Sequence, residues 1–183
     1  MELHTPRLLI DALRADDAEA LFGYRAEADV ARYQGWRPAD VAEARAFIRA
    51  QDGASPAVPG RWCQRAIRLR EDGRLIGDLG VCLPDSAEGS VEFGISVAPA
   101  CQGRGYAGEA LSALFGHGFG TLGWHRVHAS VDPRNRACIA LLHALGMRQE
   151  AHFRESLWLH GAWVDDAVFA LLAREWRRAH AAG

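Results

Sequence analysis

The sequence predicts an α+β fold with a mixed sheet, and two patterns carry that prediction. Between residues 62 and 97, three apolar segments are separated by glycine-containing turns, which is typical of an antiparallel meander. After the meander, segments with helical spacing of apolar residues alternate with segments that have the pattern of strands. With 183 residues and 49% hydrophobic residues, the chain is expected to bury a full core as one domain, residues 1–183.

The N-terminal part is expected to contain one strand, three helical segments and a long loop. Apolar alternation predicts the strand at Arg7–Leu13. The loop Asp52–Gly60 contains two prolines and two glycines, so we expect it to be irregular and a candidate mobile lid. The expected helical segments are 16–28, capped by Asp16 or Asp17, then 29–36, and then 38–51, opened by Pro38.

The rest of the chain is expected to complete the sheet and to pack two amphipathic helices against it. The three strands of the meander are expected at 62–70, 74–83 and 90–97, with turns at 71–73 and 84–89. The following elements are expected to be a helix at 105–118, a strand at 126–131, a helix at 135–145 stopped by Gly146, strands at 148–157 and 163–171 joined through His160-Gly161, and a helical tail at 173–182.

Composition and spacing argue against several classes of protein. The formal net charge is −2 and basic residues form no block, which argues against a nucleic-acid partner. The chain has no lysine, which excludes a Schiff-base or P-loop lysine. The four cysteines form no C-x-x-C pair and the histidines lack ligand spacing, so no metal is expected. Because neither a signal peptide nor a run of about 18 apolar residues is present, a cytoplasmic protein without a membrane span is expected.

A glycine-rich turn, Gln102–Gly108, lies between the last strand of the meander and the next helix. Its glycines allow close approach of a ligand to the backbone, and the N–H groups that begin the helix favour a phosphate. Gly103, Gly105 and Gly108 fit the dinucleotide pattern G-x-G-x-x-G, which requires the first glycine directly after a strand of a βαβ unit. Here five residues separate Val97 from Gly103, and the strand belongs to a meander. A dinucleotide site is therefore disfavoured.

In another frame, the turn matches an acyl-CoA motif. Gln102, Gly105 and Ala107 fit Q-x-x-G-x-A, which resembles the signature of the GNAT N-acetyltransferase superfamily. The resemblance covers nearly the whole chain, and its ending is similar to the RimJ/RimL-like branch of ribosomal-protein N-terminal acetyltransferases. It implies the GNAT fold, a mixed, mostly antiparallel twisted sheet with helices on both faces. The other matching segments are Thr5–Leu8, Ile76–Gly80, Glu92–Gly94, Asn135 with Cys138, Leu145–Met147 and Leu171–Trp176.

The resemblance also implies a function and a set of cofactor contacts. The implied reaction moves an acetyl group from acetyl-CoA directly to a primary amine, either a protein N-terminus or a small amine. Backbone N–H groups of the turn would hold the CoA pyrophosphate, and an anion at a helix N-terminus needs no lysine. Backbone of the preceding strand would pair with the pantetheine. The implied cofactor-binding residues are Ile95, Ser96, Val97, Gln102, Gly103, Arg104, Gly105, Tyr106, Ala107, Gly108 and Asn135.

Two residues are candidates for proton transfer, each with a purely structural alternative. Strand alternation puts Glu92 on one face with Gly94 and Ser96, where it is either a general base for the amine or a surface carboxylate. Gly94 is expected at a bulge or a close backbone approach. Cys138 stands where this branch often has a serine proposed to protonate the CoA thiolate, and it is equally suited to be a small buried side chain. Asn135 can also serve simply as a helix cap.

The acceptor site is the least determined part of the prediction. Tyr33 and Trp36 come from the segment that walls the acceptor site in the family, so they are expected to contact the substrate. The expected partner is an amine acceptor. Whether a second copy of the chain also binds, to form a homodimer, is left open. Many members of the family carry a tyrosine that acts as the general acid where this chain has Leu142. This departure, together with Cys138, keeps open a second class of function, a non-catalytic acyl-CoA sensor.

Overall fold

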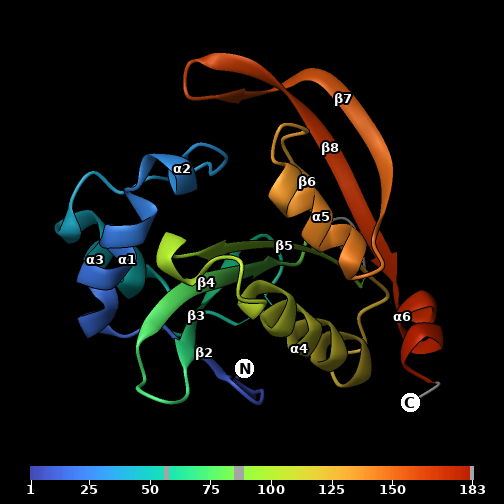
Figure 1. The fold of residues 1–183 in the computed structure, drawn as a ribbon, viewed down its shortest axis with the longest axis horizontal. Helices are drawn as coiled ribbons and strands as arrows, with labels where there is room; N and C mark the ends of the chain where they lie inside the picture. The colour runs from blue at the N-terminus through green and yellow to red at the C-terminus, as the bar shows by residue number, and fades with distance from the viewer. Residues whose placement is uncertain (56–57, 85–88, 182–183) are drawn as a thin grey trace.

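The computed structural model of the protein describes residues 1–55, 58–84 and 89–181. Eight strands form one sheet in the order β1-β2-β3-β4-β5-β6-β8-β7. Neighbouring strands are antiparallel except β5 and β6, which are parallel (Figure 1). The predicted α+β class with a mixed, mostly antiparallel sheet is confirmed. The strands are β1 (Leu3–His4), β2 (Leu8–Ala12), β3 (Trp62–Leu69), β4 (Leu75–Cys82), β5 (Ser90–Val97), β6 (Arg126–Val131), β7 (Arg148–Leu159) and β8 (Ala162–Leu172).

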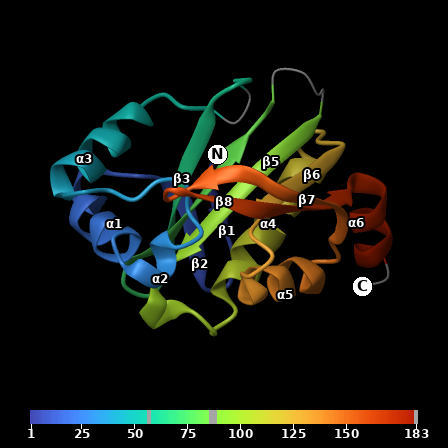
Figure 2. The same ribbon diagram turned by 90° about the horizontal axis from the view of Figure 1, so that it is seen from above.

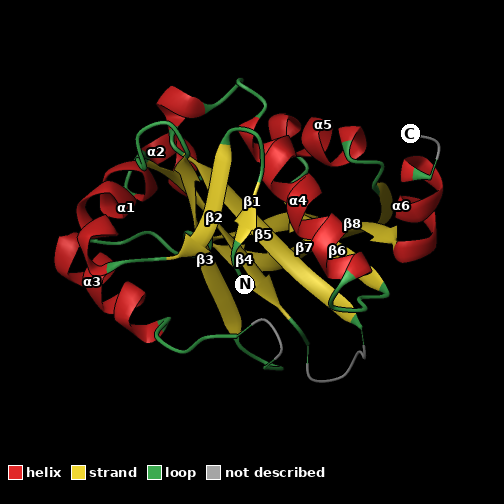
Figure 3. Cartoon of the chain, turned by 90° about the horizontal axis from the view of Figure 1, so that it is seen from below, coloured by secondary structure: helices red, strands yellow, loops and turns green. Residues whose placement is uncertain are grey.

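Different helices cover the two faces of the sheet, as Figures 2 and 3 show from opposite sides. On one face, called the α4 face, Leu111 and Phe115 are completely buried against strand residues such as Phe93 and Val127. On the other, called the α1 face, α1 and α3 form a smaller core around Ala66 of β3. The helices are α1 (Ala18–Arg25), α2 (Ala28–Ala31), α3 (Val41–Ala50), α4 (Tyr106–Gly120), α5 (Arg136–Ala144) and α6 (Ala173–His180), with 3-10 turns at Ala15–Asp17 and Pro99–Cys101.

The N-terminal helices are shorter than their expected ranges. Of the segment expected to be helical at 29–36, only residues 29–31 are helical, as the end of the four-residue α2. The chain is irregular from 34 to 40, where Gly35 and Pro38 lie. The next helix begins three residues later than expected, at Val41, because Asp40 is its cap and accepts a hydrogen bond from the Glu43 N–H at 2.8 Å. The two-residue strand β1 was not expected, since so short a segment has no detectable period.

The C-terminal hairpin is longer than its apolar pattern indicated. Its strands β7 and β8 extend to a two-residue turn at His160-Gly161, where both residues have positive φ, 50° and 81°. The hairpin rises away from the rest of the sheet and reaches over toward α2 (Figure 1). Parts of the expected loop 52–60, the turn 84–89 and the tail 173–182 lie outside the described residues. In the described part, no helix is long and apolar enough to cross a membrane.

Candidate active site

The sheet divides in the middle, between its two parallel strands. Strands β5 and β6 pair only from Ser90 to Glu92, opposite Arg126 to His128. Beyond that point β5 continues along β4 to Val97, while β6 continues along β8. In the described part of the chain, the edge of β5 from residue 93 to 97 therefore has no neighbouring strand. We call this opening the fork, and Figure 1 shows β7 and β8 turning away beyond it.

The direction of the backbone groups decides which residues of β5 face the fork. The Ala98 N–H donates to the Ile76 carbonyl of β4 at 2.8 Å, and Ser96 is paired with Asp78 of the same strand. Because peptide groups alternate sides along a strand, Ile95 and Val97 present their N–H groups to the fork. Of the three residues expected to pair with pantetheine, Ile95 and Val97 thus face the opening. The backbone of Ser96 faces β4, which is contrary to expectation.

The glycine turn joins β5 to α4 in a conformation that only glycine adopts readily. Gly103 and Gly105 have φ of 72° and 80°, and Gly105 caps α4 in the left-handed region. The first helical hydrogen bond runs from the Glu109 N–H to the Gly105 carbonyl at 3.1 Å. The N–H groups of the preceding residues, 106–108, therefore have no acceptor within the helix and emerge at its positive end. Gln102 fixes the turn to the strand, because its Nε2 donates to the Val97 carbonyl at 2.9 Å.

A residue from the start of the chain braces this turn from outside. Arg7 donates from Nη1 to the Arg104 carbonyl at 3.0 Å and from Nε to Glu109 Oε2 at 2.6 Å. Its guanidinium also lies 4.6 Å from the centre of the Tyr106 ring. Burial disfavours ionisation of Glu109, but hydrogen bonds from Thr5 and Arg7 outweigh it and hold the pKa below its usual value. The sequence predicted Arg7 only as the start of a strand and Thr5 only as part of a segment that matches the family.

Glu92 lies where the fork begins, at the last paired position of β5. It is half-buried on the α1 face, whereas its neighbours Val91 and Phe93 are buried on the α4 face, so the expected alternation is present. Burial, followed by the negative charge of Asp166, raises the pKa of the Glu92 carboxyl. A raised pKa makes the carboxylate a better proton acceptor. Its register partner is His128, which the sequence predicts not to be a metal ligand. Burial and Arg126 lower the pKa of this imidazole.

Gly94 has neither the bulge nor the close approach to another backbone segment that was expected there. The β4–β5 ladder is in regular register through Gly94, which is opposite Gly80, so there is no bulge. A Cβ at Gly94 would meet no described heavy atom within 4 Å, whereas one at Gly77 would lie 2.3 Å from the Ser96 carbonyl oxygen. The strand that requires a glycine at close approach is therefore β4.

The two residues expected at the start of α5 have clear structural surroundings. Asn135 caps the helix, because its Oδ1 accepts a hydrogen bond from the Cys138 N–H at 3.1 Å. The structural role foreseen for Asn135 is thus present, and its contact with a cofactor stays a prediction. The Cys138 thiol is partly buried, and this burial raises its pKa to about 11. The thiol therefore holds its proton at neutral pH.

The side chains of Tyr33 and Trp36 both contact other parts of the fold. The Tyr33 hydroxyl donates to the Arg134 carbonyl, at 3.5 Å, in the loop after β6. The Trp36 ring stacks on Phe47 with 4.2 Å between centroids. The tip of the C-terminal hairpin also reaches this region, where His160 Nε2 lies 3.1 Å from the Ala31 carbonyl. The segment thus links α3, the loop after β6 and the hairpin, and its contact with an acceptor stays a prediction.

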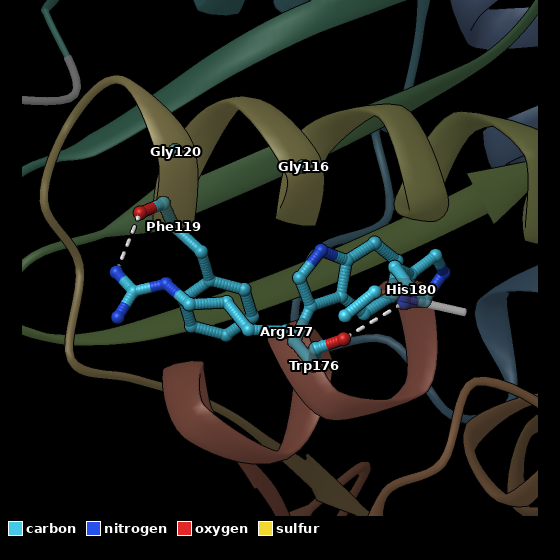
Figure 4. A pocket seen from close by; sticks show the side chains of 7 residues that line it. Gly116, Phe119, Gly120, Trp176, Arg177 and His180 are labelled. Carbon is cyan, nitrogen blue, oxygen red and sulfur yellow. Dashed lines mark hydrogen bonds between the residues drawn. The ribbon is translucent and has the colours of Figure 1, made fainter. Parts of the chain in front are cut away.

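Two other features lie outside this constellation. A surface hollow of about 320 Å³ lies between the C-terminal half of α4 and α6 (Figure 4), at the opposite end of α4 from the glycine turn. It is lined by Gly116, Phe119, Gly120, Trp176, Arg177, His180 and Ala181. Among the described residues, no group of three or more His, Cys, Asp or Glu is arranged to hold a metal ion.

The forked sheet and the capped glycine turn define an acyltransferase of the GNAT class, and comparison with known proteins agrees. The Acetyltransferase (GNAT) domain family matches residues 7–148, so the chain belongs to this family. It is 31% identical to an uncharacterized N-acetyltransferase, p20, of Bacillus licheniformis, over 95% of this chain and 97% of that protein. A GNAT-family acetyltransferase structure from Bacillus anthracis superposes with a TM-score of 0.86 at 26% identity, covering 96% of this chain and 100% of the other.

Some relatives carry a substrate in their names, and they include one that acts on a ribosomal protein. The [ribosomal protein uS5]-alanine N-acetyltransferase of Escherichia coli is 32% identical over 84 residues, which are 46% of this chain and 43% of that enzyme. The resemblance to the GNAT family, seen first in the glycine turn, is confirmed, and so is the prediction of an acyltransferase.

Proposed function

We propose that the protein transfers an acetyl group from acetyl-CoA directly to a primary amine. The observation that carries this proposal is the fork beside the glycine turn. The N–H groups of Ile95 and Val97, which pair with no strand in the described ranges, face the opening. The N–H groups of 106–108, which have no acceptor within the helix, lie at the positive end of the 15-residue α4. An elongated molecule with amide groups and a pyrophosphate fits such donors. The Arg104 side chain can add a charge-assisted contact to a phosphate oxygen.

The chain's own residues supply positioning and proton transfer. Acetyl-CoA supplies a thioester, whose carbonyl carbon is attacked by the lone pair of a neutral amine. Glu92 takes the proton that the amine gives up, since it is half-buried at the start of the fork and its pKa is raised. The C–S bond then breaks and the thiolate leaves with the bonding electron pair. The protonated thiol of Cys138 is our candidate donor of a proton to that thiolate. Much of the rate would come from holding the two reactants together.

The acceptor belongs to the class of primary amines, either a protein N-terminus or a small amine. The relative named as an alanine N-acetyltransferase of ribosomal protein uS5 supports the first, and it also supports a place in the RimJ/RimL-like branch. We propose further that the acetyltransferase domain extends beyond the matched residues 7–148, because β7 and β8 belong to the same sheet. We place the protein in the cytoplasm, where the free thiols of Cys63, Cys101 and Cys138 would persist.

A thiol-release assay tests the proposal. The protein is incubated with acetyl-CoA and a panel of primary amines, including a peptide with an N-terminal alanine, and release of CoA thiol is followed together with the mass of the acetylated amine. Catalysis predicts thiol release that depends on one class of amine and matches product formation. Tight CoA binding with no acetylated product from any amine would instead favour the alternative, a non-catalytic acyl-CoA sensor.

A further inference from the structure

Two glycines lie side by side on the α1 face, next to the fork. Gly80 of β4 and Gly94 of β5 are directly opposite each other in the ladder. A Cβ at Gly80 would lie 2.4 Å from Gln64 Oε1 and 2.9 Å from Trp62 Cε3, so this position is covered by side chains of β3. A Cβ at Gly94 would meet nothing described within 4 Å. The sheet is therefore bare at Gly94 and bounded by an aromatic ring on the β3 side.

The aromatic ring beside this bare position is itself open to solvent. Trp62 is the first residue of β3, and 44% of it is exposed even though its ring lies over Gly80. An exposed indole face attracts apolar groups and ring systems, and such contacts favour binding of an aryl or alkyl chain. Gln64, the other side chain over Gly80, is held in place because its Nε2 donates to Asp78. The wall at this position is therefore formed by Trp62.

Polar groups without partners lie on both sides of Gly94 along β5. Glu92 is half-buried on the fork side and has no hydrogen bond or ion pair with a residue in the described ranges. Ser96, on the other side, is 4% exposed, and its hydroxyl has no hydrogen-bond partner in the part of the chain that the structure describes. Buried polar groups in proteins are normally paired. A carboxylate and a hydroxyl left unengaged on either side of an open position point to a ligand there.

The nearby charges favour an ammonium group at Glu92. Asp78, the register partner of Ser96, is completely buried and is neutralised by the Arg25 guanidinium, whose Nε donates to Asp78 Oδ1 at 3.0 Å. Asp166, which accepts a hydrogen bond from the Ser130 hydroxyl at 2.6 Å, adds negative charge near Glu92. A protonated amine that arrives at Glu92 thus meets negative charge on the α1 face, beside an apolar wall.

We infer that Glu92, Gly94 and Trp62 form the acceptor subsite, and that it takes a primary amine carrying a slim aryl or alkyl chain. The amino group lies at Glu92, the chain crosses the bare sheet at Gly94, and its apolar end packs against the indole of Trp62. This inference rests on the proposed acetyl transfer and names the acceptor for it. A side chain at position 94 would occupy the path of the acceptor, whereas the backbone that faces the fork, and with it the donor site, would be unchanged.

The test separates acceptor binding from donor binding. In Gly94→Val, KM for 2-phenylethylamine should rise by roughly tenfold or more, because added methyl groups fill the path, while the Kd for CoA stays within about twofold. The matched control is Gly23→Ala, since Gly23 is exposed on α1 and a Cβ there also meets nothing described within 4 Å. Thermal unfolding is measured for both variants, and Gly94→Ala replaces Gly94→Val if the larger side chain prevents folding.

Trp62 provides a second, independent readout. The wild-type protein should prefer 2-phenylethylamine to ethanolamine, and Trp62→Ala should remove that preference. Binding of 2-phenylethylamine should change the intrinsic fluorescence of the wild-type protein but not that of Trp62→Phe, which tests amine binding without turnover. An unchanged amine KM in Gly94→Val, an equal loss of amine and CoA binding, or an unchanged preference in Trp62→Ala overturns the inference. If the wild type acetylates no amine at all, the proposed function itself fails.

Discussion

Arg7 and Glu109, 102 positions apart in the sequence, are joined by a hydrogen bond of 2.6 Å between Nε and Oε2. The same guanidinium donates to the carbonyl of Arg104, so the segment between β1 and β2 holds the turn that begins α4. The side chain does not need to touch a ligand to matter, because it fixes the loop whose N–H groups would meet the pyrophosphate. Arg7 is in this sense a positioning residue.

Replacing Arg7 should therefore weaken CoA binding more than it slows the reaction. We expect Arg7→Ala to raise the Kd for CoA by roughly tenfold, as for loss of a charge-assisted hydrogen bond, with kcat changed less. Arg7→Lys should recover only part of the loss, because an ammonium cannot reproduce the planar fork of guanidinium. Calorimetric titration measures both, and Arg74→Ala, which removes an exposed ion pair at a hairpin turn, is the control. Equal affinity for CoA in Arg7→Ala and wild type would show that Arg7 does not position the glycine turn for binding.

The glycine turn can be tested with two glycines that share a conformation but differ in surroundings. Both Gly103 and Gly105 have positive φ, so an alanine at either position is strained by a similar amount. A Cβ at Gly105 would lie 3.4 Å from Arg7 Nη2, whereas one at Gly103 has open space around it. We expect Gly105→Ala to raise the Kd for CoA by about tenfold or more and Gly103→Ala to have a smaller effect. Similar small losses in both variants would argue against a phosphate site at the helix start.

The acidic side of the pH–rate profile should report Glu92. A base works only when deprotonated, so the rate should fall as pH drops through the raised pKa of this carboxyl. Asp166→Asn removes a neighbouring negative charge that contributes to the raised pKa, and should move that limb to lower pH. Glu92→Gln should abolish the limb and lower kcat by about a hundredfold. The same amine is used throughout, so that its own titration cancels, and a wild-type profile in Glu92→Gln would remove this residue from the mechanism.

The buried pair of Asp78 and Arg25 should be important for stability. Asp78 is completely buried and accepts hydrogen bonds from Tyr24, at 2.5 Å, as well as from Arg25 and Gln64. Asp78→Asn leaves the guanidinium without its counter-charge, which should lower the free energy of unfolding by about 3–5 kcal/mol. Asp72→Asn, in the exposed pair with Arg74, should cost at most about 1 kcal/mol. Urea denaturation measures both, and equal stabilities would show that the buried charge is compensated elsewhere.

The sequence predicted what is local and missed what depends on register and long-range contact. The helix at α4 and the alternation around Glu92 follow from short apolar periods, so they could be read directly. The direction of the Ser96 backbone depends on how β5 pairs with β4, which no period within one strand reveals. The contact between Arg7 and Glu109 joins distant segments and has no signal in spacing. That backbone of β5 is free to pair with a pantetheine was expected only through the family resemblance.

Cys138 offers the sharpest distinction between a chemical and a structural role. Because burial raises its pKa to about 11, roughly a thousandth of the thiol is ionised at pH 8, and iodoacetamide should inactivate the protein very slowly there. If the thiol protonates the leaving group, Cys138→Ala should lower kcat by about a hundredfold and Cys138→Ser should retain most of it. If the side chain only fills space, both variants should turn over like the wild type, and only their stabilities should differ. Measuring kcat and the urea midpoint for the two variants separates these outcomes, because a hydroxyl can donate a proton and a methyl group cannot.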